Sequence, residues 1–300
     1  MQFAHIGQQL RAFRLESGLR AEEIAARLGV SRAALYRYEK GEVIKLETIR
    51  RLAELLNISP LTLLGMGIEY FSRPIGFFER VASLEEDADH IVFIGGSFCP
   101  LIMSADIDAF LLEVWPGLSP NKAEHAVSFA AHETLLAQLT GRRRRYQQRK
   151  PVLNVVLGEA SIRLALSDGF MAGVTLNEAQ RRRAIALAHA ETERLASLME
   201  DLPMGLQLGV LEGPEVNTPF QLLRGREKTH VCVSPFRIDI PPNLALGVAT
   251  VTAADEAVTS YQRIAETAWS RALKGSEGAA RLRHLLADNG GSARGHKPGP

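Results

Sequence analysis

The sequence is poor in cysteine and has no long hydrophobic run. Its two cysteines, Cys99 and Cys232, exclude a disulfide framework and lack the spacing of metal ligands, so we expect no metal site. We expect both thiols to be buried in a protein of the reducing cytoplasm. The longest apolar stretch, IVFIGGSFCPLIM, is too short and too rich in glycine to span a bilayer, so no membrane contact is expected. The first residues also lack the charged-then-apolar pattern of a secretion signal.

Charge of one sign is also lacking, because 35 lysines and arginines stand against 34 acidic residues, for a formal net charge of +1. This balance excludes a strongly basic or acidic protein, so a surface for nucleic acid would have to be local. A hydrophobic fraction of 46% and a charged fraction of 23% are those of an ordinary globular protein. A length of 300 residues is enough for two domains, each with its own core.

The hydrophobic pattern divides the chain near residue 90. Residues 1–68 have the pattern of five short helices with tight joints, and residues 69–90 that of a connecting helix with a break near Pro74. Between residues 91 and 288, apolar runs bounded by glycine, proline and asparagine alternate with helical patterns, which predicts a mixed α/β domain for sensing or dimerisation. Residues 289–300, NGGSARGHKPGP, have almost no apolar content and are expected to be a disordered tail.

The strands of the α/β domain are expected in the runs HIVFIGG, PVLNVVLG, MGLQLGVLE, FQLLRG, THVCVSPF and LGVATVT. Its helices are expected over residues 106–115, 121–149, 176–200, 253–275 and 279–288. The pattern does not define the order of the strands in the sheet.

The stretch LGVSRAALYRYEKGE, residues 28–42, carries the clearest functional signal. Gly29 ends a helix that begins near Ala21, and Ser31 caps the next helix, which ends at Gly41. Ala25 and Gly29 are small where the two helices must cross. Two short helices joined by a glycine-containing turn are the local signature of a helix-turn-helix.

GLRAEEIAARLGVSRAALYRYEKG, followed by LETIRRLAELLNIS, resembles the lambda-repressor/Cro-like (XRE-type) class of bacterial helix-turn-helix regulators. The resemblance covers residues 6–65, about a fifth of the chain. It implies a five-helix DNA-binding domain whose third helix, residues 31–40, lies in the major groove of double-stranded DNA. Residues 70–290 resemble the poorly characterised C-terminal regions attached to such domains, which implies no particular ligand.

The resemblance assigns base reading to the outer face of helix 31–40, at Arg32, Ala33, Tyr36 and Arg37. Arginine matches the paired acceptors of guanine, although a single exposed arginine is more often solvated or paired with a nearby acid. Contacts to the DNA backbone are expected from Arg11, Arg20, Ser31 and Lys45. The family often has a backbone-contacting glutamine where this chain has Ala21, and the adjacent Arg20 is expected to substitute for it.

The region after residue 90 shows no catalytic constellation, so we expect no enzyme. HIVFIGGSFC lacks the lysine of a phosphate-binding loop and the third glycine of a dinucleotide fingerprint, so no nucleotide cofactor is expected. Two clusters are candidates for lining an effector pocket: Phe93, Ser97 and Met103 in one, and Phe220, Gln221, Ser234, Phe236 and Arg237 in the other. Among them, Ser97, Ser234 and Arg237 are the candidate effector-binding residues, with Arg237 gripping an anionic effector.

The run RRRRYQQRK, residues 142–150, holds six positive charges. We interpret it as a solvated helix end whose cations pair with acids elsewhere in the chain. The alternative interpretation is a further contact to DNA phosphates or an anionic-effector site.

The sequence as a whole predicts a sequence-specific transcriptional regulator that acts as a homodimer, because two DNA half-sites suit a two-fold protein. The apolar faces of helices 121–148 and 177–201 are candidates for the dimer interface, although core packing explains them equally well. The alternative is the antitoxin of a toxin–antitoxin pair, a DNA-binding autoregulator whose C-terminal domain binds a partner protein. The sequence defines neither the effector nor the operator.

Overall fold

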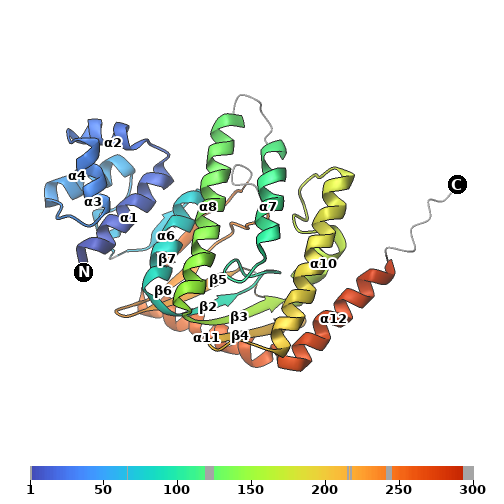
Figure 1. Cartoon of the computed structure of the whole chain (residues 1–300). Coiled ribbons are helices and arrows are strands. Elements are labelled where there is room, and N and C mark those ends of the chain that lie inside the picture. Colours follow the sequence, from blue (N-terminus) through green and yellow to red (C-terminus); the bar gives the residue numbers. More distant parts are fainter. Residues whose placement is uncertain are drawn as a thin grey trace.

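The chain forms a bundle of short helices followed by a mixed sheet with helices on both of its faces (Figure 1). The computed structural model describes residues 2–65, 67–118, 125–214, 216, 218–240 and 245–292, with the backbone alone for residues 2–5, 125–131 and 290–292. Within these ranges, no helix combines the length and the apolar character needed to cross a membrane.

The N-terminal helices are α1 (Gln2–Ser17), α2 (Ala21–Leu28), α3 (Arg32–Glu39), α4 (Leu46–Leu56) and α5 (Pro60–Leu63). Apolar residues at helical spacing bring them together, and Leu10, Ile24, Leu35 and Leu52 are completely shielded from solvent in their core. Pro60 begins α5 at the first helical position, where its missing amide hydrogen costs no hydrogen bond.

Residues 69–292, which we call the sheet domain, contain eight strands within the described ranges. They are β1 (Glu69–Phe71), β2 (Ala88–Ile94), β3 (Val152–Gly158), β4 (Leu206–Leu211), β5 (Phe220–Gly225), β6 (Thr229–Val233), β7 (Ala249–Thr252) and β8 (Leu273–Lys274). Their order in the sheet is β1-β7-β6-β5-β2-β3-β4-β8. The central strands β2, β3 and β4 run parallel, and every other neighbouring pair is antiparallel.

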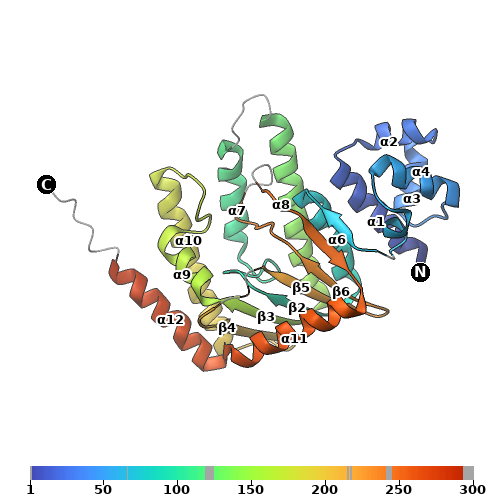
Figure 2. The same ribbon diagram turned by 180° about the vertical axis from the view of Figure 1, so that it is seen from behind.

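Parallel strands need crossover connections, and helices provide them here. One face of the sheet carries α6 (Pro74–Asp87), α7 (Ala105–Val114), a short 3-10 turn (Trp115–Leu118), α8 (His125–Arg149), α9 (Glu159–Asp168) and α10 (Glu178–Glu200). The opposite face is covered by α11 (Asp255–Arg271), seen in front of the sheet in Figure 2, and α12 (Gly275–Ser292) packs along α10. The sheet thus separates a larger core on one face from a smaller one beneath α11.

The six strands expected from the sequence are confirmed, with ends that differ by a few residues. The expected helix over residues 69–90 is wrong at both ends. Glu69–Phe71 pair with β7 as an edge strand, the helix begins at Pro74, and the chain enters β2 at Ala88. Proline starts this helix and does not break it, because it occupies the first turn. The predicted tail begins too early, since α12 continues to Ser292, and residues 293–300 lie outside the described residues.

Two arginines of the basic run 142–150 are buried, contrary to the interpretation of a solvated helix end. Arg142 donates through Nε and Nη2 to the two carboxylate oxygens of Glu85, at 2.8 and 2.7 Å. Arg143 forms the same kind of pair with Asp108, at 2.8 and 3.1 Å. The arginine side chains are 1% and 8% exposed, so the run pairs with acids as expected but offers neither of these cations to DNA phosphates.

The apolar faces considered for a dimer interface are also used inside the chain. The buried residues of α10 include Leu195, Ala196 and Met199, and this helix contacts α7, α9 and α12. Helix α8 contacts α6, α7 and the 3-10 turn. Core packing therefore accounts for the described part of these faces, whereas residues 121–124 and the side chains of residues 125–131 lie outside the described residues.

The N-terminal helices and the sheet domain share one hydrophobic core. The ring of Phe13 in α1 stacks on Phe71 in β1, with ring centroids 5.3 Å apart and an angle of 6° between the ring planes. Phe71 meets the edge of Phe77 in α6 at 6.2 Å, and Phe77 meets Phe236 at 6.1 Å. Four packed rings thus run from α1 into the interior of the sheet domain.

Polar contacts fix the same junction. The carboxylate of Glu69 accepts hydrogen bonds from Gln9 of α1 at 3.0 Å and from Arg80 of α6 at 2.8 and 2.9 Å. Glu16 of α1 accepts from the backbone amides of Ser72 and Arg73 at the start of α6, a position where the helix dipole favours negative charge. Because these groups form hydrogen bonds across the junction, α1 has a defined orientation on the sheet domain.

Candidate nucleic-acid interface and internal cavity

The turn between α2 and α3 depends on a left-handed glycine. Gly29 has φ 70° and ψ 30°, and a Cβ added there would meet no atom within 4 Å. The prediction that Gly29 is small to permit a close helix crossing is therefore wrong, and the residue is needed for its backbone conformation. The close approach occurs at Gly7 of α1, where an added Cβ would lie 2.6 Å from the carbonyl oxygens of Tyr38 and Glu39 at the end of α3.

Gly29→Ala is expected to lower the free energy of unfolding by about 1 kcal/mol, because alanine is strained at this positive φ although its Cβ has room. Gly29→Asn should lower the free energy of unfolding by less than Gly29→Ala does, since asparagine tolerates the left-handed region. Urea unfolding of both variants would measure the difference. A loss of several kcal/mol in the alanine variant would contradict the open space around this residue.

The four residues predicted to read bases lie together on the exposed face of α3: Arg32, Ala33, Tyr36 and Arg37. The opposite face of the helix buries Ala34 and Leu35 in the core. The Ser31 side chain caps the helix by accepting a hydrogen bond from the amide of Ala34 at 3.1 Å. Arg32 donates to the Tyr36 hydroxyl at 3.1 Å, so these two side chains form one unit on the surface.

Both arginines of this face have acidic neighbours. Arg32 pairs with Glu22 at 2.7 Å and Arg37 with Glu42 at 3.5 Å, while their side chains stay 58% and 62% exposed. The hydrogen bond to Tyr36 and the charge of Glu22 raise the pKa of Arg32, which keeps it cationic. Exposed ion pairs are weak and screened by salt, so a stronger acceptor can displace either glutamate.

Three of the four residues predicted to contact the DNA backbone lie at helix starts. Arg20, Ser31 and Lys45 are the residues that precede the first turns of α2, α3 and α4. Helix N-termini favour anions, so these positions suit phosphate groups. Arg11 lies elsewhere, because its Nε pairs with Glu79 of α6 at 2.8 Å. Arg11 therefore also takes part in the junction with the sheet domain, and its contact with the DNA backbone stays a prediction.

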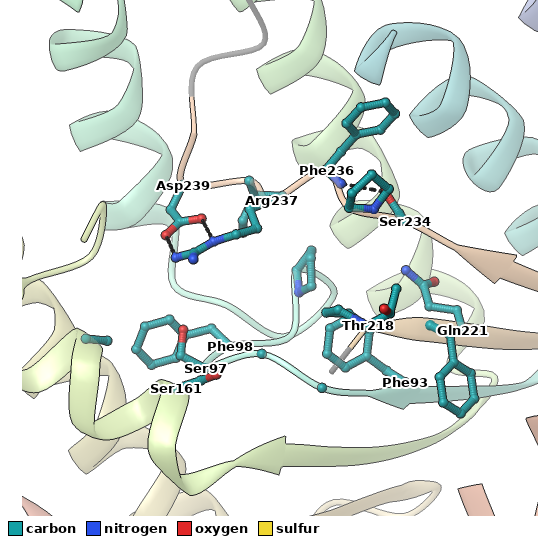
Figure 3. Close-up of a pocket in the computed structure, with 18 of the residues that line it drawn as sticks. Phe93, Ser97, Phe98, Ser161, Thr218, Gln221, Ser234, Phe236, Arg237 and Asp239 are labelled. Carbon is teal, nitrogen blue, oxygen red and sulfur yellow. Dashed lines mark hydrogen bonds and ion pairs between the residues drawn. The ribbon is translucent and has the colours of Figure 1, made fainter. Parts of the chain in front are cut away.

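The sheet domain has a partly open cavity of about 550 Å³ at the carboxyl ends of β2 and β3 (Figure 3). All three candidate effector residues, Ser97, Ser234 and Arg237, line it. Ser97 follows β2 after the turn Gly95–Gly96, whose φ values are 107° and 77°, and Ser234 follows β6 directly. In open α/β sheets, ligands commonly bind outside the carboxyl ends of the strands.

Arg237, which was predicted to bind an anionic effector, is paired with an acidic residue of the chain. Both carboxylate oxygens of Asp239 bind its guanidinium group, with Nε and Oδ1 2.8 Å apart. These hydrogen bonds raise the pKa of Arg237. The donors that a guanidinium group offers to a bidentate acceptor are therefore already used by the Asp239 carboxylate. An anionic effector would have to displace Asp239, which is itself buried.

Of the two predicted clusters, every member except Met103 lines the cavity. Sequence reasoning missed four phenylalanines of the lining, namely Phe77, Phe78, Phe98 and Phe170. The adjacent pair Phe77 and Phe78 was a visible signal, but it fell in the segment interpreted as a connecting helix. Within the described ranges, no three histidine, cysteine or acidic side chains gather as metal ligands.

Comparison with known families agrees with the geometry of α2 and α3. A family model described as a helix-turn-helix domain matches residues 5–64. The N-terminal segment is a helix-turn-helix domain. This match spans a fifth of the chain and leaves the sheet domain unassigned.

The other comparisons add little to this assignment. No curated protein matches the chain. One solved structure that matches is that of TrmBL2, an archaeal chromatin protein reported to show a novel mode of DNA binding, with 9% identity and a TM-score of 0.35. The match covers 76% of this chain and 61% of TrmBL2, so this chain spans less than two thirds of that protein. A likeness this low carries no argument about fold or function.

The excess of positive charge lies in the helix-turn-helix domain. Residues 1–65 contain ten arginines and lysines against seven glutamates, whereas the rest of the chain has 25 basic and 27 acidic residues. A nearly neutral protein that attracts DNA needs such a local excess. The helix-turn-helix domain therefore combines the basic charge with the exposed face of α3.

Proposed function

We propose that this chain is a sequence-specific transcriptional regulator of the lambda-repressor/Cro-like (XRE-type) class, acting inside the cell as a homodimer on double-stranded DNA. The observation that carries the proposal is the exposed face of α3, on which two arginines and a tyrosine follow a capped helix start. A helix presented in this way fits the major groove, where residues near its N-terminus contact base edges.

In this proposal the cavity of the sheet domain receives a small-molecule effector. Phe77 and Phe236 line the cavity and contact each other, and Phe77 also contacts Phe71, which stacks on Phe13 of α1. A ligand that moves Phe77 would therefore move α1 and change the relative orientation of the two recognition helices in a dimer. The ligand changes DNA affinity only to the extent that it prefers one of these orientations.

The DNA-binding assignment is tested with Arg32→Ala and Arg37→Ala. Each is expected to weaken binding to the preferred site about tenfold to a hundredfold, because each removes a side chain suited to bidentate base contact. The preferred site is first selected from a random duplex library with the unaltered protein. Affinities are then measured by fluorescence anisotropy at two salt concentrations, and circular dichroism checks that both variants fold.

Arg50→Ala is the matched control, because Arg50 is an exposed arginine of α4 held by Glu47 and Glu54. It should change affinity little and equally for preferred and unrelated duplexes. Unchanged affinity of both α3 variants for the preferred site would refute base reading by this helix. Equal losses in all three variants would show that the arginines act only through charge.

A further inference from the structure

One polar side chain on the floor of the cavity lacks a partner. The strand register aligns Phe93, Gln221 and Cys232 across β2, β5 and β6, and all three line the cavity. Gln221 is only 8% exposed, and its Oε1 atom accepts no hydrogen bond from the protein. Figure 3 shows its amide end turned toward the opposite wall, where Ser234 and Phe236 lie.

The same row of side chains contains a second buried polar residue, Glu69, whose hydrogen bonds can be compared with those of Gln221. Continuing from Cys232, the row passes through Val251 of β7 to Glu69 of β1. Both oxygens of Glu69 are hydrogen-bonded, to Gln9 and Arg80. Buried polar groups are normally satisfied in this way, so the unsatisfied oxygen of a residue that lines a cavity points to a ligand that supplies the donor.

Phenylalanine is the most frequent residue of the remaining lining. Its phenyl rings come from α6, from β2 and the loop after it, and from two later loops: Phe77, Phe78, Phe93, Phe98, Phe170 and Phe236. Phe220 also borders the cavity, but its ring packs on Tyr261 beneath the sheet. Ring-lined walls favour a flat aromatic ligand, which gains both apolar burial and ring–ring contact.

The charges of the lining argue against an ionic ligand. Of the described lining residues, Arg237 and Asp239 are the charged ones, and they bind each other through both carboxylate oxygens. Burial raises the pKa of the Cys232 thiol, so this part of the floor stays neutral. A charged ligand would find no unpaired opposite charge among these lining residues. No ion pair would therefore offset the free energy that it costs to remove the ligand's charge from water.

We propose that the cavity binds an uncharged aromatic molecule carrying an N–H or O–H group that donates a hydrogen bond to Oε1 of Gln221. The inference rests on the proposed function, in which this cavity receives the effector, and it names the chemical class of that effector. A volume of about 550 Å³ lies within the range of cavities that hold small organic ligands.

Three probes that share one ring system separate the effect of the hydrogen-bond donor on binding from the effect of a negative charge. Indole is neutral and has one N–H donor, 1-methylindole is neutral without the donor, and indole-3-carboxylate carries a negative charge. Isothermal titration of the full-length protein should show indole binding about tenfold more tightly than 1-methylindole, since the methylated probe leaves the buried acceptor unsatisfied. Indole-3-carboxylate should bind more weakly than indole.

Gln221→Leu keeps the size of the side chain and removes the acceptor, so indole and 1-methylindole should then bind with equal affinity. Gln221→Met repeats the test if the leucine variant fails to fold. Gln207→Leu is the control, because Gln207 is an exposed glutamine of β4 outside the cavity, and the preference for indole should persist. Equal binding of indole and 1-methylindole to the unaltered protein, tighter binding of the carboxylate, or no binding of any probe would overturn the proposal.

These titrations contain no DNA, so their failure leaves base reading by α3 standing. If indole binds with the expected preference and DNA affinity does not change, the ligand class is upheld and the effector role in the proposed function is refuted.

Discussion

Phe71→Ala is expected to lower the free energy of unfolding by about 3–5 kcal/mol, the usual cost of truncating a fully buried phenylalanine. Phe71 is completely shielded from solvent, stacks on Phe13 and meets the edge of Phe77. The cavity left by its ring would open between α1 and α6, the two helices that join the helix-turn-helix domain to the sheet domain. We therefore expect the variant to loosen this junction as well as to destabilise the chain.

Amide hydrogen exchange would show which part of the chain loses stability in Phe71→Ala. Amide protons of α1 should exchange much faster in Phe71→Ala, while those of β3, in the middle of the sheet, should change less. Phe71→Leu is the matched control and should lose about half as much stability, because it keeps part of the apolar volume. Equal acceleration in α1 and β3 would show that the junction opens only with global unfolding, contrary to the expected local effect.

Arg142→Met is expected to cost about 3–5 kcal/mol, because it leaves the carboxylate of Glu85 buried without its partner. Glu85 is 8% exposed and shares both of its oxygens with the Arg142 guanidinium group. The guanidinium carbon also lies 5.6 Å from the centre of the Phe78 ring, so methionine would replace only the apolar part of that contact. Urea unfolding would measure the loss.

The double variant Glu85→Leu with Arg142→Met should recover most of this stability, since no buried charge is left unpaired. Arg144→Met is the control, because Arg144 belongs to the same basic run but is exposed, and it should change stability by less than about 0.5 kcal/mol. A double variant no more stable than Arg142→Met alone would show that the arginine acts through packing and not through its charge.

Most strands and helix α3 were predictable because their signals are local. Runs such as PVLNVVLG are bounded by residues that stop a strand, and Ser31 with Gly29 marks a helix start within three residues. Strand β1 has three residues and alternates in burial, so it is stable only because β7 lies beside it. That pairing joins residues about 180 positions apart, which a local pattern does not encode.

The candidate cavity was predictable only in part, because several of its features depend on contacts that a local sequence pattern does not encode. Ser97 and Ser234 follow strand signals, so the position of each near the end of a strand could be expected from the sequence. The pairing of Arg237 with Asp239 depends on the shape of a loop, and the isolation of Gln221 depends on the register of β5 between β2 and β6. Likewise, the burial of Arg142 follows from the approach of α6 to α8, because a run of arginines looks the same in sequence whether it is solvated or paired.

Strand β1 limits how this gene can recombine with others. A chimera that joined a foreign helix-turn-helix domain to residue 69 would remove Phe13 from Phe71 and Gln9 from Glu69. The inner side of α1 thus contacts the sheet domain, while the outer face of α3 can change with the DNA site of the proposed function. A productive exchange of DNA-binding specificity would therefore transplant the outer residues of α3 and leave α1 in place.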